Sequence, residues 1–329
     1  MWWAMHGVVM RLFHPAIDTR RARRVQVRPF MAELLQQVIN GLSLGAIYAL
    51  IALGYTMVYG VLRFINFAHS DVFMIGAFSG YYLAPRLGGG TFWGGLAVLF
   101  SAMAICAVLG VIIEKLAYRP LRGRSTLSVL ITAIGVSLLI QNVAQNQRIG
   151  FGPNPKAFPK IFPEANFHLG SLVISSNQII VLGVTIGLLA ALWWIVHRTR
   201  IGTAMRAVSY NATAASLMGI NNDRVISFTF ALGSALAGAG GILYAMNYPS
   251  IDPLMGTLPG LKAFVAAVLG GIGNLPGAAL GGMIIGLVET FVSGTKASTF
   301  RDAIAFAILI LILLFRPAGL LGKQRVEKV

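Results

Sequence analysis

Charged side chains are scarce in this sequence. Asp, Glu, Lys and Arg make up 11% of the 329 residues, whereas 57% of the residues are hydrophobic. A soluble domain is typically about one quarter charged, so this chain has too few charges to cover a water-exposed surface of its size. The shortage excludes a soluble globular protein and predicts one membrane domain.

Cysteine and catalytic motifs are also lacking. The single cysteine, Cys106, lies in an apolar run, which excludes an internal disulfide and favours a buried, unreactive side chain. The sequence has no G-x-x-x-x-G-K-[ST] phosphate-binding loop, no His–Cys–carboxylate group with metal-ligand spacing and no Ser-His-Asp set. We therefore expect no metal, no cofactor and no enzymatic activity. If ATP drives this protein, another subunit must hydrolyse it.

Acidic residues are the rarer charged class. The chain has 26 Lys and Arg against 10 Asp and Glu, a formal net charge of +16. In a soluble protein this excess would suggest a nucleic acid partner, but here the basic residues lie in short segments between apolar runs, as in cytoplasmic loops of membrane proteins. We therefore expect no nucleic acid partner. The segments 115–124, 198–206 and 316–328 are predicted to be cytoplasmic, and the loops 148–177 and 248–258 to lie outside.

Apolar runs long enough to cross a bilayer, about 20 residues each, recur along the chain. We predict spans at 34–59, 66–84, 92–118, 127–147, 179–196, 225–247 and 303–315. The run 258–290 is broken by glycines and Pro276, and it predicts two crossings or a re-entrant pair. Closely spaced prolines forbid a helix in 148–177. The predicted fold is an all-α membrane protein, a polytopic bundle of eight or nine helices, and glycines four apart, such as Gly41 and Gly45, favour close packing.

The first 30 residues differ from the rest. A short apolar patch precedes a cluster of arginines, the reverse of the order in a secretory signal. These arginines also contradict the outside start that the charge pattern assigns to the first span. We expect residues 1–30 to be a basic extension, either from a start codon assigned too early or as an interfacial segment, and residues 31–329 to be the membrane domain.

The cytoplasmic segment 200–220, RIGTAMRAVSYNATAASLMGI, does not have the composition of an ordinary polar loop. It predicts two short helices, one at about 203–208 and a second that Asn211 N-caps and Gly219 ends. Leu217, Met218 and Ile220 would then form an apolar patch on a cytoplasmic loop, and such a patch needs a partner surface. The alternative is a loop packed against its own bundle.

Polar side chains inside the spans are candidates for a translocation path: Asn66, His69 and Asp71 at the start of the second span, and Gln141 and Asn142 at the end of the fourth. Each also has a structural interpretation. A charge at bilayer depth usually faces protein or water, and we expect Asp71 to pair with Arg63. His69 is more often a satisfied core histidine than a proton carrier, and the two amides could simply cap their helix at the headgroups.

Lys262 and Glu289 are the two charged residues in the predicted run 258–290 that could contact a substrate. Both lie near span ends, where long side chains can extend toward the headgroups. We therefore expect no pair of charges built to hold the carboxylate and ammonium of an amino acid together.

Five segments resemble the LivH-type permeases of bacterial branched-chain amino acid ABC importers. They are NGLSLGAIYALIALGYTMVYG (40–60), FINFAHSD (64–71), VLGGIGNLPGAALGG (268–282), FRPAGLLG (315–322) and the segment 200–246. The resemblance runs in order through residues 31–329. Two departures stand out: Ser70 replaces a usual glycine, and the acidic residue that the family tends to carry near Tyr210 is absent.

The resemblance implies a permease of the type II importer architecture in the bacterial inner membrane. It implies ABC ATPase subunits, a second homologous permease and a periplasmic binding protein as partners, the lipid bilayer as surroundings, and an amino acid as substrate. The ATPase-coupling residues would be Arg200, Gly202, Arg206, Asn211, Ala215, Leu217, Met218, Gly219 and Ile220. Three alternatives remain open: the same importer carrying urea, amides or another small polar solute, a self-sufficient carrier, and a membrane enzyme.

Overall fold

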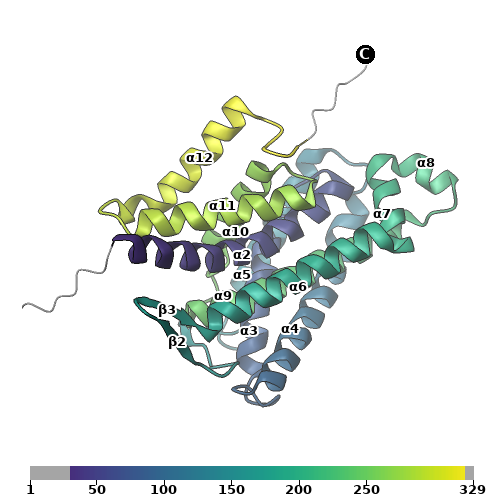
Figure 1. Ribbon diagram of the computed structural model, residues 1–329. Helices are drawn as coiled ribbons and strands as arrows, with labels where there is room; N and C mark the ends of the chain where they lie inside the picture. Colours follow the sequence, from purple (N-terminus) through teal and green to yellow (C-terminus); the bar gives the residue numbers. More distant parts are fainter. Residues whose placement is uncertain (1–29, 323–329) are drawn as a thin grey trace, which may run out of the picture.

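Two long helices form the centre of the molecule (Figure 1). The computed structural model describes residues 30–322, so the extension expected at residues 1–30 lies, apart from the backbone of residue 30, outside the described residues. The central helices are α2 (Phe30–Leu62) and α9 (Asn222–Asn247), which pack against each other. Most side chains of both helices are buried, because other helices surround them.

Four helices cover the central pair. On one side lie α10 (Thr257–Gly270) and α11 (Leu275–Ser293), and α11 packs along α2. On the other side lie α3 (His69–Leu83) and α4 (Phe92–Ile113), which pack on α9. Glycines permit these approaches: a Cβ added at Gly45 would lie 2.8 Å from Met283 Cα, so α2 and α11 touch through their backbones there.

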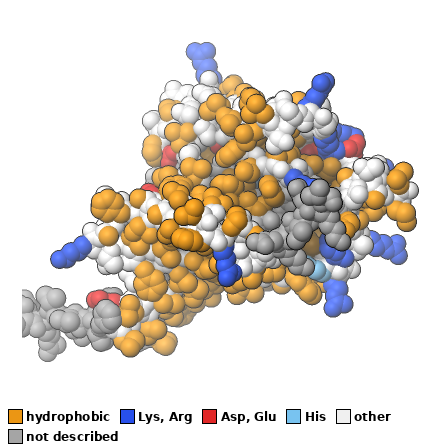
Figure 2. Space-filling view, turned by 90° about the horizontal axis from the view of Figure 1, so that it is seen from above, with side chains coloured by type: hydrophobic (Ala, Val, Ile, Leu, Met, Phe, Trp, Pro, Cys, Tyr) orange, Lys and Arg blue, Asp and Glu red, His pale blue; other side chains and the backbone are white. Residues whose placement is uncertain are grey.

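The remaining long helices are peripheral: α5 (Thr126–Gln145), α6 (Ser176–Arg198) and α12 (Arg301–Phe315). Large apolar side chains are exposed along all three, which suits helices that face lipid tails. In the space-filling view of Figure 2, hydrophobic side chains cover much of the face and Lys and Arg lie mainly toward its margins. This distribution fits a bundle embedded in a bilayer and not one dissolved in water.

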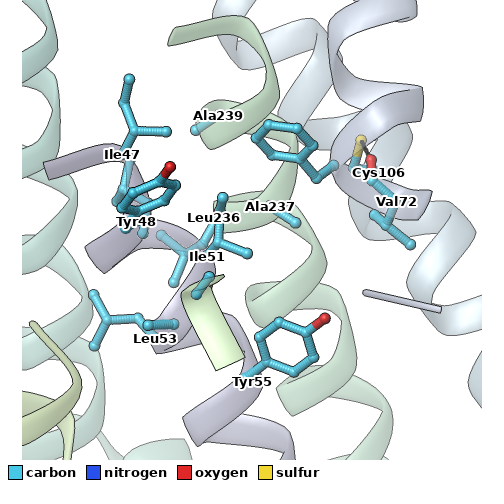
Figure 3. Packing of buried hydrophobic residues seen from close by; sticks show 14 of the residues in the cluster. Ile47, Tyr48, Ile51, Leu53, Tyr55, Val72, Cys106, Leu236, Ala237 and Ala239 are labelled. Atoms are coloured by element: carbon cyan, nitrogen blue, oxygen red, sulfur yellow. Dashed lines mark hydrogen bonds between the residues drawn. The ribbon is translucent and has the colours of Figure 1, made fainter. Parts of the chain in front are cut away.

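The interior is built from small and branched apolar side chains. Figure 3 shows Ile47 and Ile51 of α2 beside Leu236 and Ala239 of α9, all buried. Cys106 is fully buried there, and its Sγ lies 3.5 Å from the carbonyl oxygen of Val72. The expectation of an unexposed cysteine is therefore confirmed.

The segment between α5 and α6 contains no helix, as its prolines predict. Two short antiparallel pairs form instead: β1 (Lys156–Ala157) pairs with β4 (Ser250–Ile251), and β2 (Asn166–Leu169) pairs with β3 (Leu172–Ser175). The β2–β3 hairpin lies at the opposite end of the molecule from α8 (Figure 1). This arrangement matches the charge pattern, which assigns the hairpin to the outside and α8 to the cytoplasm.

The number of crossing helices agrees broadly with the sequence. Seven helices within residues 30–322 are long and apolar enough to cross a membrane. One of the seven is α12 extended by the helical turn before it, Ser298–Phe315. Two shorter helices of the bundle, α3 and α10, have 15 and 14 residues and are mostly buried. A helix of 14 residues rises about 21 Å, less than the roughly 30 Å of a hydrocarbon core. The interrupted run 258–290 is thus a short and a long helix joined by a turn, within an all-α membrane bundle.

Candidate functional site

The segment after α6, which the charge pattern assigns to the cytoplasm, forms two capped helices. The Thr199 side chain accepts a hydrogen bond from the Gly202 amide at 3.1 Å and starts α7 (Arg200–Tyr210). The Asn211 side chain accepts one from the Ala214 amide at 3.0 Å and starts α8 (Ala212–Leu217). The expected cap at Asn211 is confirmed, whereas α7 is longer than the predicted 203–208 because Thr199 caps it earlier.

The tip of α8 is apolar and exposed. Leu217 and Met218 are 82% and 84% exposed, and α8 extends from the edge of the bundle in Figure 1. Gly219 has a φ of 84°, a left-handed conformation that favours glycine, so it ends the helix as predicted. Ala215 is buried on the inner side of α8. The structure contradicts one expectation: Ile220 turns back and packs against the core, so it does not belong to the exposed patch.

The two basic residues proposed at this segment differ in their surroundings. Arg200 is exposed at the start of α7. The guanidinium of Arg206 donates hydrogen bonds to the Val196 carbonyl and, at 3.3 Å, to Thr203 Oγ1. Arg206 therefore caps the end of α6 and fixes the angle between α6 and α7. Gly202 lies at the same junction, where an added Cβ would meet the last turn of α6.

A network of charges holds the start of α9 against the loop between α4 and α5. Arg119 and Arg122 both pair with Asp223 in the first turn of α9, and Arg122 also pairs with Glu114. Glu114, which is fully buried, accepts a further hydrogen bond of 2.6 Å from Ser227 Oγ. The sequence indicated these arginines only as cytoplasmic charges, because their acidic partner lies about 100 positions away. The network attaches the α4–α5 loop to the chain that follows α8.

A cavity of about 650 Å³ lies at the end of the bundle that the charge pattern assigns to the cytoplasm. Its walls are the last turns of α2, the second half of α7 and the turn between α10 and α11. Ser209 Oγ of α7 donates a hydrogen bond to the carbonyl of Gly60, so α7 is attached directly to the end of α2. A displacement of α7 would therefore change the shape of this cavity.

The candidate path residues at the start of α3 are buried, but the expected ion pair is wrong. Gln141 Nε2 of α5 donates to Asp71 Oδ1 at 2.9 Å, and no ion pair joins Arg63 to Asp71 in the described residues. Arg63 lies in a turn with a φ of 56° and is exposed, whereas Asp71 points into the bundle. Asn142 is exposed and bonds only to Leu138 of its own helix, so it stands apart from Gln141.

The neighbouring polar groups also lie in the interior. Tyr118 OH donates to Asn66 Oδ1 at 2.6 Å, which holds the turn before α3 against the helical turn Glu114–Tyr118 that follows α4. The His69 ring lies 4.7 Å from the Tyr55 ring, and its Nε2 has no hydrogen-bond partner in residues 30–322. The structure thus brings Asn66, His69, Asp71 and Gln141 into one region. No group of three or more His, Cys, Asp or Glu in the described chain could hold a metal ion.

The expectation for the charges of α10 and α11 is also wrong. Lys262 and Glu289 do not extend toward headgroups, because their side chains are only 5% and 6% exposed. Lys262 Nζ lies 2.6 Å from Glu289 Oε1 and 2.6 Å from Asp302 Oδ1, and Tyr48 OH donates to Glu289 Oε2 at 2.8 Å. The sequence offers a signal for this pair, because a charge within apolar helices usually has a partner. Lys262 and Glu289 lie far apart in the sequence, however, so the sequence does not show that they pair with each other.

Comparison with known proteins agrees with this architecture. A family model described as the permease component of branched-chain amino acid transport systems matches residues 37–313. The high-affinity branched-chain amino acid transport system permease protein BraD of Pseudomonas aeruginosa is 43% identical over 313 residues, which cover 92% of this chain and 100% of BraD. LivH of Escherichia coli is 42% identical over 306 residues, which cover 90% of this chain and 97% of LivH.

A more distant relative extends the comparison. The ribose import permease protein RbsC of Escherichia coli is 28% identical over 227 residues, which cover 66% of this chain and 65% of RbsC. The resemblance drawn from the sequence segments is confirmed by the family match and by the two relatives above 40% identity. This chain belongs to the family of permease components of branched-chain amino acid transport systems.

Proposed function

We propose that this chain is the non-catalytic permease subunit of an ATP-binding cassette importer that moves branched-chain amino acids through the bacterial inner membrane into the cytoplasm. The observation that carries the proposal is α8, a capped cytoplasmic helix with an exposed apolar tip, in a chain of this family. The printed names of BraD and LivH support the choice of branched-chain amino acids as cargo.

Three kinds of protein partner complete the proposed importer. ATPase subunits bind α8 from the cytoplasm, where Leu217 and Met218 fill an apolar pocket of the ATPase. A second, homologous permease packs beside this one, and a periplasmic binding protein delivers the amino acid to the outer end. The absence of a phosphate-binding loop from the sequence supports ATP hydrolysis by separate subunits.

The contacts around α8 suggest how motion reaches the membrane. Closure of the ATPases on ATP shifts α8 as a rigid body. Because Asn211 is shared as the end of α7 and the cap of α8, α7 follows. α7 forms a wall of the inner cavity, so its displacement opens or closes that cavity. In this proposal Arg200 lies beside the ATPase contact, and Gly202, Arg206 and Ala215 position the two helices.

The polar cluster of Asn66, His69, Asp71 and Gln141 is proposed to line or support the path that the amino acid follows. Two observations support the proposal: Asn66, His69 and Asp71 are buried, and Asp71 Oδ2 and His69 Nε2 have no hydrogen-bond partner among residues 30–322. Asn142, which is exposed and bonded to its own helix, is the weakest member of the predicted set.

Uptake by the assembled importer tests the proposed cargo. Vesicles containing this permease, its second permease, the ATPases and the binding protein should take up leucine, isoleucine and valine only when ATP is supplied to the cytoplasmic face. We also propose residues 31–329 as the permease domain, so a chain that starts at Met31 should give equal uptake. Uptake of urea or short amides in place of leucine would contradict the cargo, and loss of uptake on truncation would contradict the domain boundary.

A further inference from the structure

A second cavity, of about 350 Å³, lies at the outer ends of α2, α6, α9 and α11. Polar side chains dominate its lining: Asn40, Gln178, Asn247, Glu289, Thr290 and Arg301. The charge pattern assigns this end of the bundle to the outside, where a delivered solute would first meet the permease. We call this cavity the outer pocket.

The lining of the outer pocket contains one cationic side chain, Arg301, and one anionic side chain, Glu289. The side chain of Arg301 is half exposed, and its nearest carboxylate in the described chain is Asp302, 3.8 Å from Nε. Glu289 also lines the pocket and is almost fully buried. Its two oxygens each accept one bond, from Lys262 and from Tyr48. A carboxylate offers about four lone-pair sites, so Glu289 retains acceptor capacity toward the pocket.

The neighbouring amides are oriented by the protein itself. Asn40 Oδ1 accepts hydrogen bonds from Gln178 Nε2 at 2.7 Å and from Gln36 Nε2 at 3.1 Å. Since both donors point at its oxygen, the Asn40 amide nitrogen is left to donate elsewhere. Gln36 is held in turn by the backbone of Val173 in β3. The pocket therefore has the Asn40 amide nitrogen as an oriented hydrogen-bond donor and the Glu289 carboxylate as an oriented acceptor.

Size and shape restrict the ligand further. Ligand pockets usually measure about 300–1,000 Å³, so a volume of about 350 Å³ suits one small solute. Leu44 and Tyr248 supply an apolar surface beside the charged groups. A ligand with an anionic group, a cationic group and a short apolar side chain would meet a complementary partner for each part.

We propose that the outer pocket is an acceptor site for a free α-amino acid zwitterion, contrary to the expectation from the sequence that no pair of charges holds both its ends. Arg301 binds its carboxylate, Glu289 binds its ammonium, and Lys262 and Tyr48 hold Glu289 in place. The inference rests on the proposed function and deepens it, because it names where the cargo first binds the permease. A phosphatidylethanolamine headgroup carries the same pair of charges, so the test must distinguish the free amino acid from the lipid.

Cysteine labelling tests this site directly, because the one native cysteine is buried. In the complete importer in detergent, Ser293→Cys places a thiol in the pocket lining, and Ser171→Cys places one on the exposed β2–β3 turn. Leucine at ten times its dissociation constant should slow labelling of the pocket thiol by a charged methanethiosulfonate about tenfold, by mass action. Labelling at Ser171→Cys should not change.

Substitution of Arg301 separates binding from a structural effect. In the Ser293→Cys background, Arg301→Gln should remove the protection by leucine, and Arg301→Lys should restore part of it because the charge is kept.

Three results would overturn the inference: no protection by leucine, full protection in Arg301→Gln, or protection by phosphatidylethanolamine alone. Absent protection with normal ATP-driven uptake would reject the pocket and retain the proposed function. Protection by leucine without ATP-driven uptake in the assembled importer would retain the pocket and reject the proposed function.

Discussion

Leu217→Asp is expected to abolish ATP-driven uptake while the permease still folds and inserts. Leu217 is 82% exposed at the tip of α8, so a carboxylate there remains solvated and removes no core contact. In the proposed importer, however, the same carboxylate would enter an apolar pocket of the ATPase. A central apolar anchor of an interface contributes about 2 kcal/mol or more, which corresponds to about 30-fold in affinity.

Co-purification of the ATPase with the permease and leucine uptake in vesicles measure this effect. Leu217→Met keeps an apolar side chain and should retain both activities. Leu169→Asp introduces the same charge at another exposed leucine, on the outer hairpin, and should leave ATPase binding unchanged. Normal ATPase binding and uptake in Leu217→Asp would remove α8 from the coupling surface.

Lys262→Met is expected to lower the stability of the bundle by about 3–5 kcal/mol, the usual effect of removing one partner of a buried ion pair. The substitution leaves the buried Glu289 and the half-buried Asp302 without their shared cation. Adding Glu289→Gln should recover most of the loss, because replacing a whole buried pair is often nearly neutral. The carbonyl oxygen of the introduced amide could still accept the hydrogen bond from Tyr48.

Thermal unfolding in detergent measures these differences, and the chain offers a matched control. Lys160 pairs with Glu164 at the surface, where the side chains are 73% and 46% exposed. A surface pair contributes about 0–1 kcal/mol, so Lys160→Met should hardly change the unfolding temperature. Equal effects of Lys160→Met and Lys262→Met, or no recovery in the double variant, would show that the buried group does not stabilise the bundle.

Features set by local chemistry could be predicted from the sequence. Asn211 and Gly219 mark the ends of α8 because a cap and a left-handed glycine act within a few residues. The prolines of 148–177 exclude a helix for the same reason. The apolar runs located the long helices, since crossing a bilayer fixes their minimum length. The exposed tip at Leu217 and Met218 also follows from its composition and its predicted cytoplasmic position.

Contacts between distant segments could not be predicted. Proximity in the sequence favours a pair between Arg63 and Asp71, but Arg63 lies in an exposed turn, and Gln141 of α5 bonds to Asp71 instead. Lys262 and Glu289 lie on different helices, and only the packing of α10 on α11 brings them together. Ile220 turned inward because the chain reverses at Gly219. Each of these depends on tertiary packing.

Vesicle uptake by the purified permease alone tests the central claim most directly, since that claim makes transport depend on force delivered through α8. We expect leucine flux no greater than in protein-free vesicles, and ATP-dependent uptake only after the ATPases, the second permease and the binding protein are added. Steady leucine transport by the isolated permease, without any ATPase present, would contradict the account.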